Sequence, residues 1–181
     1  MNTPSLRSRN DGDAGHKEVT SESFRHVMQH FGRSVTIVTT CKDRLVWGMT
    51  ATAVCGVSQC PPVILACVSR NCRTHSFIRD SGVFAVNLLR CGQEHLAERF
   101  AGRHPESSER FDGLEFQTVV TGAPVLKDCL VFADCRVVDW CGCGDHSVFV
   151  GYVEAAEQLN SGSPLVRHMG RYTKFEGAAT L

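Results

Sequence analysis

Strand-like runs of apolar and β-branched residues, separated by short polar turns, occupy most of the chain after residue 34. The predicted strands span residues 35–40, 46–54, 63–68, 83–89, 116–120, 130–140, 146–156 and 172–175. Apolar residues at helical spacing occur in three short stretches, 22–32, 74–80 and 93–100. Roughly seven or eight strands with so little helix predict a mainly β protein, a closed or nearly closed barrel with a few flanking helices.

The stretch 22–32 is predicted to be an amphipathic helix, with Ser21 as its cap and Gly32 as its end. Its apolar side is formed by Phe24, Val27, Met28 and Phe31. The stretch 93–100 is predicted to be a second helix, and its buried side is formed by Leu96, Ala97 and Phe100. Both patterns are typical of surface helices with one apolar face.

The segment of residues 48–54 has small side chains for a strand. Thr50 and Thr52 lie two residues apart, so in an extended chain their hydroxyl groups share one face, while Ala51 and Ala53 share the other. Such a strand buries little apolar area, but it lets a flat molecule approach the backbone and offers hydroxyl and N–H groups to polar edges. A thin strand packed against a neighbouring backbone is an equally good interpretation of the segment alone.

Length and composition fit a chain that needs no second domain. Its 181 residues, 43% of them hydrophobic, can build one full core. Basic and acidic residues number 19 each, so we expect no face for nucleic acid or an anionic membrane. No apolar run approaches the roughly 18 residues of a membrane span, and the N-terminal residues lack the apolar centre of a secretion signal. We expect a disordered lead at 1–20, a domain at 21–176, a tail at 177–181, and a cytoplasmic protein.

The chain has ten cysteines, a high number for a cytoplasmic protein, yet their spacing predicts neither a metal site nor a disulfide framework. No C-x-x-C pair occurs, and the C-x-C spacing of Cys141 and Cys143 is not one that structural zinc sites use. We interpret Cys55, Cys67 and Cys135 as small buried apolar residues of strands. The role of Cys141 and Cys143 stays open.

Several common catalytic and nucleotide-binding motifs are missing from the sequence. No G-x-G-x-x-G follows a predicted strand, and there is no P-loop. There is also no compact Ser-His-Asp or paired-carboxylate signature. The motifs therefore support neither a Rossmann dinucleotide site nor a nucleotide triphosphatase.

Ten blocks, in one order along residues 22–175, resemble the flavin reductase-like family, the small reductase components of two-component flavin monooxygenases. After the helix that includes Phe31, the blocks are VTIVTT (35–40), GMTATAVCGVSQCPP (48–62), NCRTHSFI (71–78), SGVFAVNLL (81–89), QEHLAERFAG (93–102), ERFDGLEF (109–116), GAPVLKD (122–128), GDHSVFVGYV (144–153) and PLVRHMGRYTKF (164–175). The fold that this resemblance implies is a Greek-key-like split β-barrel that binds FMN at a homodimer interface. It agrees with the strand count, although the pattern of the residues alone cannot name it.

The resemblance implies an enzyme, an NAD(P)H:flavin oxidoreductase. A hydride would pass from NADH or NADPH to FMN or FAD, and the reduced flavin would serve a partner oxygenase. Hydride transfer needs positioning and exclusion of water more than acid–base groups, which fits a chain without a hydrolase signature. Two other functions stay open. The same fold could hold flavin tightly and reduce a metal chelate or a corrinoid, or the chain could be a non-catalytic flavin-binding or metal-binding protein.

The resemblance also implies which residues bind the flavin. Those that would line the isoalloxazine ring and its polar edge are Met49, Thr50, Ala51, Thr52 and Ala53. Those that would hold its phosphate are Ser69, Asn71, Arg73 and Thr74. Arg73 offers a planar guanidinium, Thr74 a hydroxyl, and the helix that follows offers N–H groups at its positive end. A plain helix cap with a solvated arginine is the alternative for these two residues.

The catalytic residue that the resemblance implies is His146, on a tight turn that opens a strand. Its imidazole would hydrogen-bond the nicotinamide carboxamide or contact the pyrophosphate. A turn histidine bonded to Asp145 or to backbone is the alternative. Arg171 and Tyr172 would close over the cofactors. Asn87 also matches the family, but a strand asparagine that satisfies local backbone explains it equally well.

Overall fold

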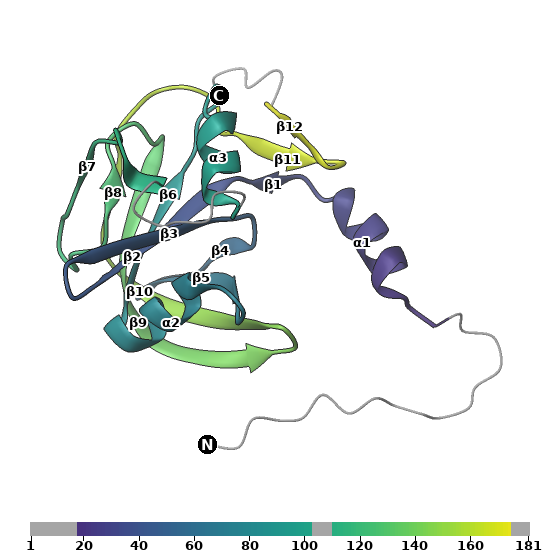
Figure 1. The fold of residues 1–181 in the computed structure, drawn as a ribbon, viewed down its shortest axis with the longest axis horizontal. Helices are drawn as coiled ribbons and strands as arrows, with labels where there is room; N and C mark the ends of the chain where they lie inside the picture. Colours follow the sequence, from purple (N-terminus) through teal and green to yellow (C-terminus); the bar gives the residue numbers. More distant parts are fainter. Residues whose placement is uncertain (1–17, 103–109, 175–181) are drawn as a thin grey trace.

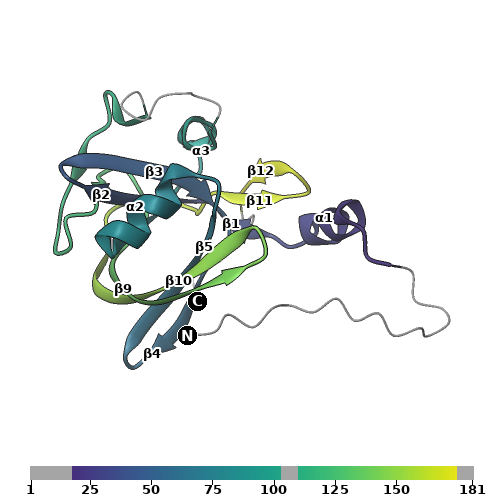
Figure 2. The ribbon, with the colours of Figure 1, turned by 60° about the horizontal axis from the view of Figure 1, so that its bottom comes forward.

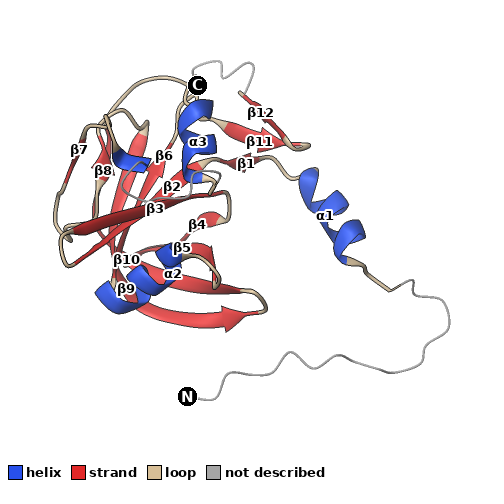
Figure 3. Cartoon of the chain, viewed as in Figure 1, coloured by secondary structure: helices blue, strands red, loops and turns tan. Residues whose placement is uncertain are grey.

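The structure, a computed structural model, describes residues 18–102 and 110–174. The helices are α1 (Ser21–Gln29), α2 (Arg73–Ser81) and α3 (Glu94–Phe100). The strands are β1 (Arg33–Ser34), β2 (Thr36–Lys42), β3 (Leu45–Ala51), β4 (Val54–Gln59), β5 (Pro62–Ser69), β6 (Val83–Leu88), β7 (Phe116–Gln117), β8 (Val125–Leu126), β9 (Val131–Cys143), β10 (His146–Gln158), β11 (Val166–His168) and β12 (Arg171–Thr173). Strands therefore dominate the described chain, as predicted (Figure 3). Most of the lead expected at 1–20 and the tail expected at 177–181 lie outside the described residues.

Seven strands form one antiparallel sheet in the order β3-β2-β6-β9-β10-β5-β4. The two edge strands, β3 and β4, follow each other in the chain, so the polypeptide crosses from one edge of the sheet to the other at residues 52–53. The sheet curls strongly (Figure 1), and in the described residues its hydrogen-bonded ladder does not close between β3 and β4. This arrangement is the split β-barrel that the sequence predicts.

The single strand expected at 46–54 is in fact two strands, because the backbone changes its partner in the middle of the segment. β3 ends at Ala51, whose carbonyl oxygen accepts a hydrogen bond from the Thr36 hydroxyl of β2 at 2.9 Å. Two residues later, the Ala53 carbonyl oxygen accepts a hydrogen bond from the backbone N–H of Cys67 in β5, also at 2.9 Å. The smallest side chains of the segment therefore lie where the barrel is split.

Two apolar clusters lie on opposite faces of the sheet, because neighbouring residues of a strand point in opposite directions. Val38 belongs to one cluster, which α2 covers with Ile78. Ile37 belongs to the other cluster, which α3 covers. The residues that α3 buries there are Leu96, Ala97 and Phe100. The predicted buried side of this helix is therefore confirmed.

The first predicted helix is confirmed as α1, but its bounds and its packing differ from the prediction. The N-cap is Thr20, one residue before the expected cap, and the helix ends at Gln29. No residue of α1 is buried, and the exposed fractions of Phe24, Val27 and Phe31 are 58%, 56% and 56%. Figures 1 and 2 both show α1 standing apart from the sheet. Most of its apolar face is therefore exposed in the described chain, and of its four residues Met28 alone is half-buried.

Two other strands are shorter than predicted. β7 covers Phe116–Gln117 rather than 116–120, because the N–H groups of Val120 and Thr121 donate to the Asp134 carboxylate instead of to a strand. β12 ends at Thr173, and the end of the strand expected at 172–175 lies outside the described residues. The short strands β8 and β11 were not predicted. No described helix is long and apolar enough to cross a membrane.

All ten cysteines lie in the described part of the chain, and all are free thiols. Cys135 is buried, as predicted, and its burial raises the pKa of the thiol to about 12. Cys67 is half-buried. Cys55 is exposed, which corrects the prediction, because it lies on β4, an edge strand whose residues are nearly all exposed.

Candidate functional site

A cleft of about 450 Å³ lies where β3, the end of β5 and the first turn of α2 meet. The residues that line it are Trp47, Met49, Thr50, Ser69, Asn71, Cys72, Arg73, Thr74, Phe100, Ala101, Gly102 and Arg110. They include two of the predicted ring-lining residues, Met49 and Thr50, and all four of the predicted phosphate residues. The structure therefore brings together two segments that lie about twenty residues apart in the sequence.

Helix α2 begins at this cleft without a side-chain cap. The side chain of its N-cap residue, Cys72, bonds no N–H group of the helix, and its Sγ donates instead to the Ser69 carbonyl oxygen at 3.0 Å. The Thr74 hydroxyl oxygen is buried and has no hydrogen-bond partner among the described residues. Free N–H groups and the partial positive charge of a helix start favour an anion there. The Thr74 hydroxyl therefore caps no N–H group of the helix, while the Arg73 side chain is exposed, as the alternative of a solvated arginine expects.

Two guanidinium groups lie beside the Trp47 ring, which is itself buried. The distance from the ring centroid to Cζ is 5.1 Å for Arg73 and 5.9 Å for Arg110, within the range of cation–π attraction. Arg110 also donates from Nη1 to the Gly48 carbonyl oxygen at 3.0 Å. Burial lowers the pKa of Arg110, but an arginine keeps its charge in proteins. The cleft therefore has two cations held against one aromatic ring.

The sequence did not single out Trp47 or Arg110. Trp47 occupies an ordinary strand position. Arg110 is the last residue of the polar stretch 103–110, which is predicted to be a loop. The rest of that stretch lies outside the described residues. The one available signal was the block ERFDGLEF, which contains Arg110 but suggests no role for it.

The predicted ring-lining segment is divided between different surroundings. Met49 and Thr50 line the cleft, but the Thr50 hydroxyl donates to a backbone carbonyl oxygen of α3 at 2.6 Å, so its proton is already used. Ala51 is buried in the apolar cluster that α2 covers. Thr52 lines a second hollow, between α1 and the β11–β12 hairpin, and Ala53 is exposed. Only the first part of this segment therefore lies at the cleft.

His146 opens β10 at the turn that follows β9. Its Nδ1 lies 2.7 Å from Oδ1 of Asp145, and this hydrogen bond lowers the pKa of that carboxyl group. His146 pairs with Ser69 in the sheet, and the Arg70 N–H donates to the Asp145 carbonyl oxygen at 3.0 Å. The turn is therefore fixed to the segment that leads into the cleft. The side chain of His146 is 45% exposed and does not line the cleft itself.

A buried histidine that the sequence did not single out connects the cleft to this turn. His75, in the first turn of α2, is 7% exposed, and its Nε2 lies 2.9 Å from the Ser147 hydroxyl oxygen. Its ring packs edge-on against Phe149. Burial, followed by the charges of Arg79 and Arg70, lowers the pKa of His75, so the ring is neutral near pH 7.

Three residues predicted to bind the cofactors, Asn87, Arg171 and Tyr172, lie away from the cleft. Asn87 is fully buried in β6: its Nδ2 donates to a backbone carbonyl of β2 and to the Thr39 hydroxyl, and its Oδ1 accepts from a backbone N–H of β8. It is the strand asparagine of the alternative interpretation. The Tyr172 hydroxyl donates to the Glu98 carboxylate at 2.8 Å, and Arg171 is exposed on β12. Neither residue lines the cleft.

Comparison with known proteins identifies the family. Residues 28–176 match the family described as "Flavin reductase like domain", so the chain belongs to the flavin reductase like family. The resemblance seen in the sequence blocks is thereby confirmed.

Two curated relatives and one solved structure illustrate the similarity. The chain is 39% identical over 154 residues to "FMN reductase (NADH) RutF 2" of Methylorubrum extorquens, covering 85% of this chain and 88% of the relative. It is 30% identical over 171 residues to "Flavin-dependent monooxygenase, reductase subunit HsaB" of Rhodococcus jostii, covering 94% and 86%. The structure of "NADH:FAD oxidoreductase SgcE6" of Streptomyces globisporus matches with a TM-score of 0.82 at 28% identity, covering 92% of this chain and 100% of that one.

Proposed function

We propose that this chain is an NAD(P)H-dependent flavin reductase that reduces FMN or FAD and supplies the reduced flavin to a partner oxygenase. The observation that carries the proposal is the uncapped start of α2 with its unpartnered Thr74 hydroxyl, in a member of the flavin reductase like family. The names of the relatives support the use of both flavins and of NADH. The HsaB name, that of a monooxygenase reductase subunit, supports an oxygenase partner.

The residues of the cleft fit a flavin nucleotide whose phosphate lies at α2. The first-turn N–H groups, the Thr74 hydroxyl and the Arg73 guanidinium would donate to the phosphate, and Arg110 would add a second positive charge. Met49 and Phe100 offer apolar surface to the ring system. The cleft therefore has a charged end and an apolar wall, as a phosphorylated ring compound requires.

The bound flavin would supply the hydride acceptor, and the chain supplies position and exclusion of water. At the β9–β10 turn, Asp145 holds Nδ1 of His146, and Nε2 makes no hydrogen bond to the described residues. His146 would use Nε2 to hold the nicotinamide carboxamide. The bond between His75 and Ser147 fixes the strand that carries His146 relative to the helix that would hold the phosphate.

We also propose that two copies of the chain associate through α1. The unburied side chains of Phe24, Val27 and Phe31 give this helix an apolar face, which burial against a second copy would stabilise. Light scattering should give twice the chain mass of 19.9 kDa, and Val27→Asp should shift the population toward the single chain. A single-chain mass for the unmodified protein would contradict the proposal.

A cytoplasmic location is part of the same proposal. All ten cysteines are free thiols, which fits a reducing compartment. NAD(P)H and a partner oxygenase would be available there.

The test of the function is nicotinamide oxidation by the purified protein, with NADH or NADPH combined in turn with FMN, FAD or riboflavin in excess. Turnover that depends on added flavin is the expected result, and the matrix identifies the preferred pair. Turnover by copurified flavin with no stimulation by added flavin would favour a tightly held cofactor and another acceptor. Flavin binding without nicotinamide oxidation would contradict the enzymatic proposal.

A further inference from the structure

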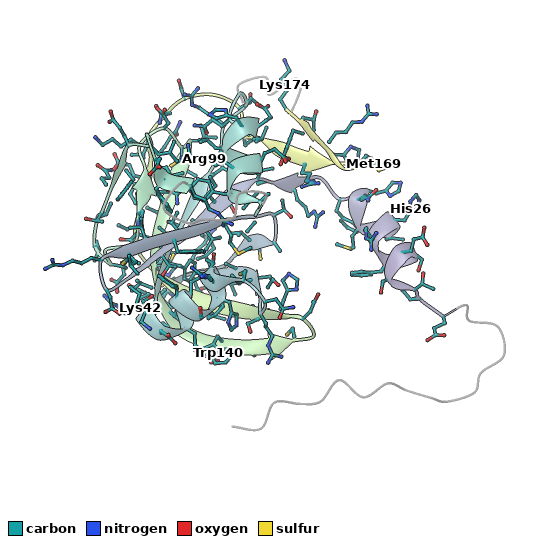
Figure 4. The ribbon with its side chains drawn as sticks, viewed as in Figure 1. His26, Lys42, Arg99, Trp140, Met169 and Lys174 are labelled. Carbon is teal, nitrogen blue, oxygen red and sulfur yellow. The ribbon has the colours of Figure 1, made fainter. Side chains whose placement is uncertain are left out.

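Cys141 and Cys143 are two exposed thiols at the end of β9 that the proposed function does not use. Their sulfur atoms lie 3.9 Å apart. They are next to Trp140, which Figure 4 labels at the β9–β10 end of the molecule. An exposed pair of this kind differs from a single surface cysteine, because the second thiol can react with an oxidised form of the first.

The two sulfur atoms can join once the backbone between them bends. Residues two apart in a strand point to the same face with their Cα and Cβ atoms about 6.4–6.8 Å apart, whereas a disulfide needs its Cβ atoms about 3.5–4.5 Å apart. Gly142 between them has no side chain to resist this bending. A Cβ at Gly142 would find its nearest neighbour, Nη1 of Arg70, only at 3.9 Å, so the position is not crowded.

Cys141 and Cys143 differ from two other cysteines of the same sheet, Cys67 and Cys135, in being exposed. The hydrogen bond with Cys143 is the main cause of a raised pKa at Cys141. Cys67 lies on the same sheet face, since it and Cys141 both pair with Val148, but it is half-buried. Cys135 is buried and its pKa is about 12, which leaves it inert.

We propose that Cys141 and Cys143 form a reversible dithiol–disulfide site that hydrogen peroxide oxidises. One sulfur attacks the peroxide, so that an S–O bond forms, the O–O bond breaks and one water leaves, which gives a sulfenic acid. The second sulfur then attacks the first, so that the S–S bond forms and a second water leaves. In total, two thiols lose two protons and two electrons, and one peroxide becomes two waters. A small dithiol reductant restores both thiols by exchange. This proposal does not depend on the function proposed above.

The test uses the full chain, reduced, freed of reductant and treated with one equivalent of hydrogen peroxide. The remaining thiols are then labelled with N-ethylmaleimide in denaturant, and the intact protein and its peptides are weighed. The expected product is about 2 Da lighter before labelling, takes up two labels fewer, and contains Cys141 joined to Cys143. Dithiothreitol should restore both labels.

Two variants and one control decide the outcome. Cys141→Ser and Cys143→Ser should each abolish the loss of two labels, and Cys60→Ser, at another exposed cysteine, should preserve it. A disulfide that joins either residue to Cys67 would overturn the proposal. Labels on both Cys141 and Cys143 after treatment, or oxidation of either sulfur beyond the sulfenic acid without a disulfide, would overturn it as well.

Discussion

The first turn of α2 and the β9–β10 turn are neighbours in the fold, yet they are built in opposite ways. At α2, the unpartnered Thr74 hydroxyl is buried, and two arginines lie against a buried tryptophan. At the β9–β10 turn, the side chains of Asp145 and His146 are 85% and 45% exposed and bond chiefly to each other. The first region keeps the Thr74 hydroxyl out of water, beside an exposed Arg73, whereas the second keeps both of its polar side chains in water.

This difference indicates which ligand each region serves. Donors kept out of water bind a charged group strongly, because little water competes with them. A phosphate that must stay in place through a reaction therefore fits the start of α2. An exposed imidazole binds more weakly but remains open to a substrate that comes and goes, which fits the nicotinamide.

Of the variants that test this comparison, Arg73→Ala is expected to have the largest effect. The loss of a charge-assisted hydrogen bond, about 1.5–3 kcal/mol, should raise the Kd for FMN by about tenfold to 150-fold. Riboflavin, which has no phosphate, should bind the variant as well as it binds the unmodified protein. Calorimetric titration of each flavin measures both values. Arg79→Ala is the matched control, since Arg79 lies in the last turn of the same helix and pairs with Asp80. Unchanged FMN affinity in Arg73→Ala would place the phosphate elsewhere.

The next largest effect is expected from His146→Ala. Loss of one orienting hydrogen bond should lower kcat/KM for the nicotinamide by about tenfold to a hundredfold, while flavin affinity stays unchanged. Steady-state kinetics with flavin titrations measure both quantities. His168→Ala, at an exposed histidine of β11, is the control. A collapse of flavin affinity in His146→Ala would show that the two regions do not divide their tasks in this way.

The sequence predicted those parts of the fold and the site that depend on contiguous residues. The start of α2 was found because Arg73 and Thr74 lie together in one block at a helix start. The division of the barrel after Ala51 was missed, because strand propensity continues through the small residues. β3 ends where the Ala51 carbonyl oxygen accepts a hydrogen bond from the Thr36 hydroxyl. Thr36 lies fifteen residues earlier, so the local pattern of residues does not encode this end.

Residues from distant parts of the chain were the hardest to assign. Arg110 reaches the cleft only because the chain returns to Trp47 after more than sixty residues. Asn87 matched the family, but a match does not tell which way a strand residue points, and it points into the interior. The exposed face of α1 could not be foreseen either, because amphipathic spacing predicts that a face is buried without saying by what.

A smaller effect, on stability, is expected at His75, which joins the two regions. The pKa of buried His75 is lowered below its usual value of about 6.5, so the unfolded chain takes up a proton more readily than the folded one. The free energy of unfolding should therefore fall as the pH drops below about 6.5. His75→Gln should flatten this dependence, measured as urea midpoints between pH 7.5 and 5.5. The control is His95→Gln. If the pH dependence of the free energy of unfolding were equally steep in His75→Gln, His75 would not be the group that causes it.

The smallest effect is expected from Asp145→Asn, which keeps an oxygen to bond Nδ1 of His146 but removes the charge. The hydrogen bond to His146 lowers the pKa of the Asp145 carboxyl in the folded chain. The ionised carboxylate therefore stabilises the fold above the usual pKa of about 3.9, and this stabilisation is lost as the pH falls through the lower pKa of the folded chain. Because the pair is exposed, we expect kcat/KM for the nicotinamide to fall by only about twofold to fivefold at neutral pH, measured by the same kinetics. A loss as large as that of His146→Ala would mean that the charge of Asp145 holds the imidazole in place. The β9–β10 turn would then be as preorganised as the start of α2, and the contrast between the two regions would reduce to their exposure to water.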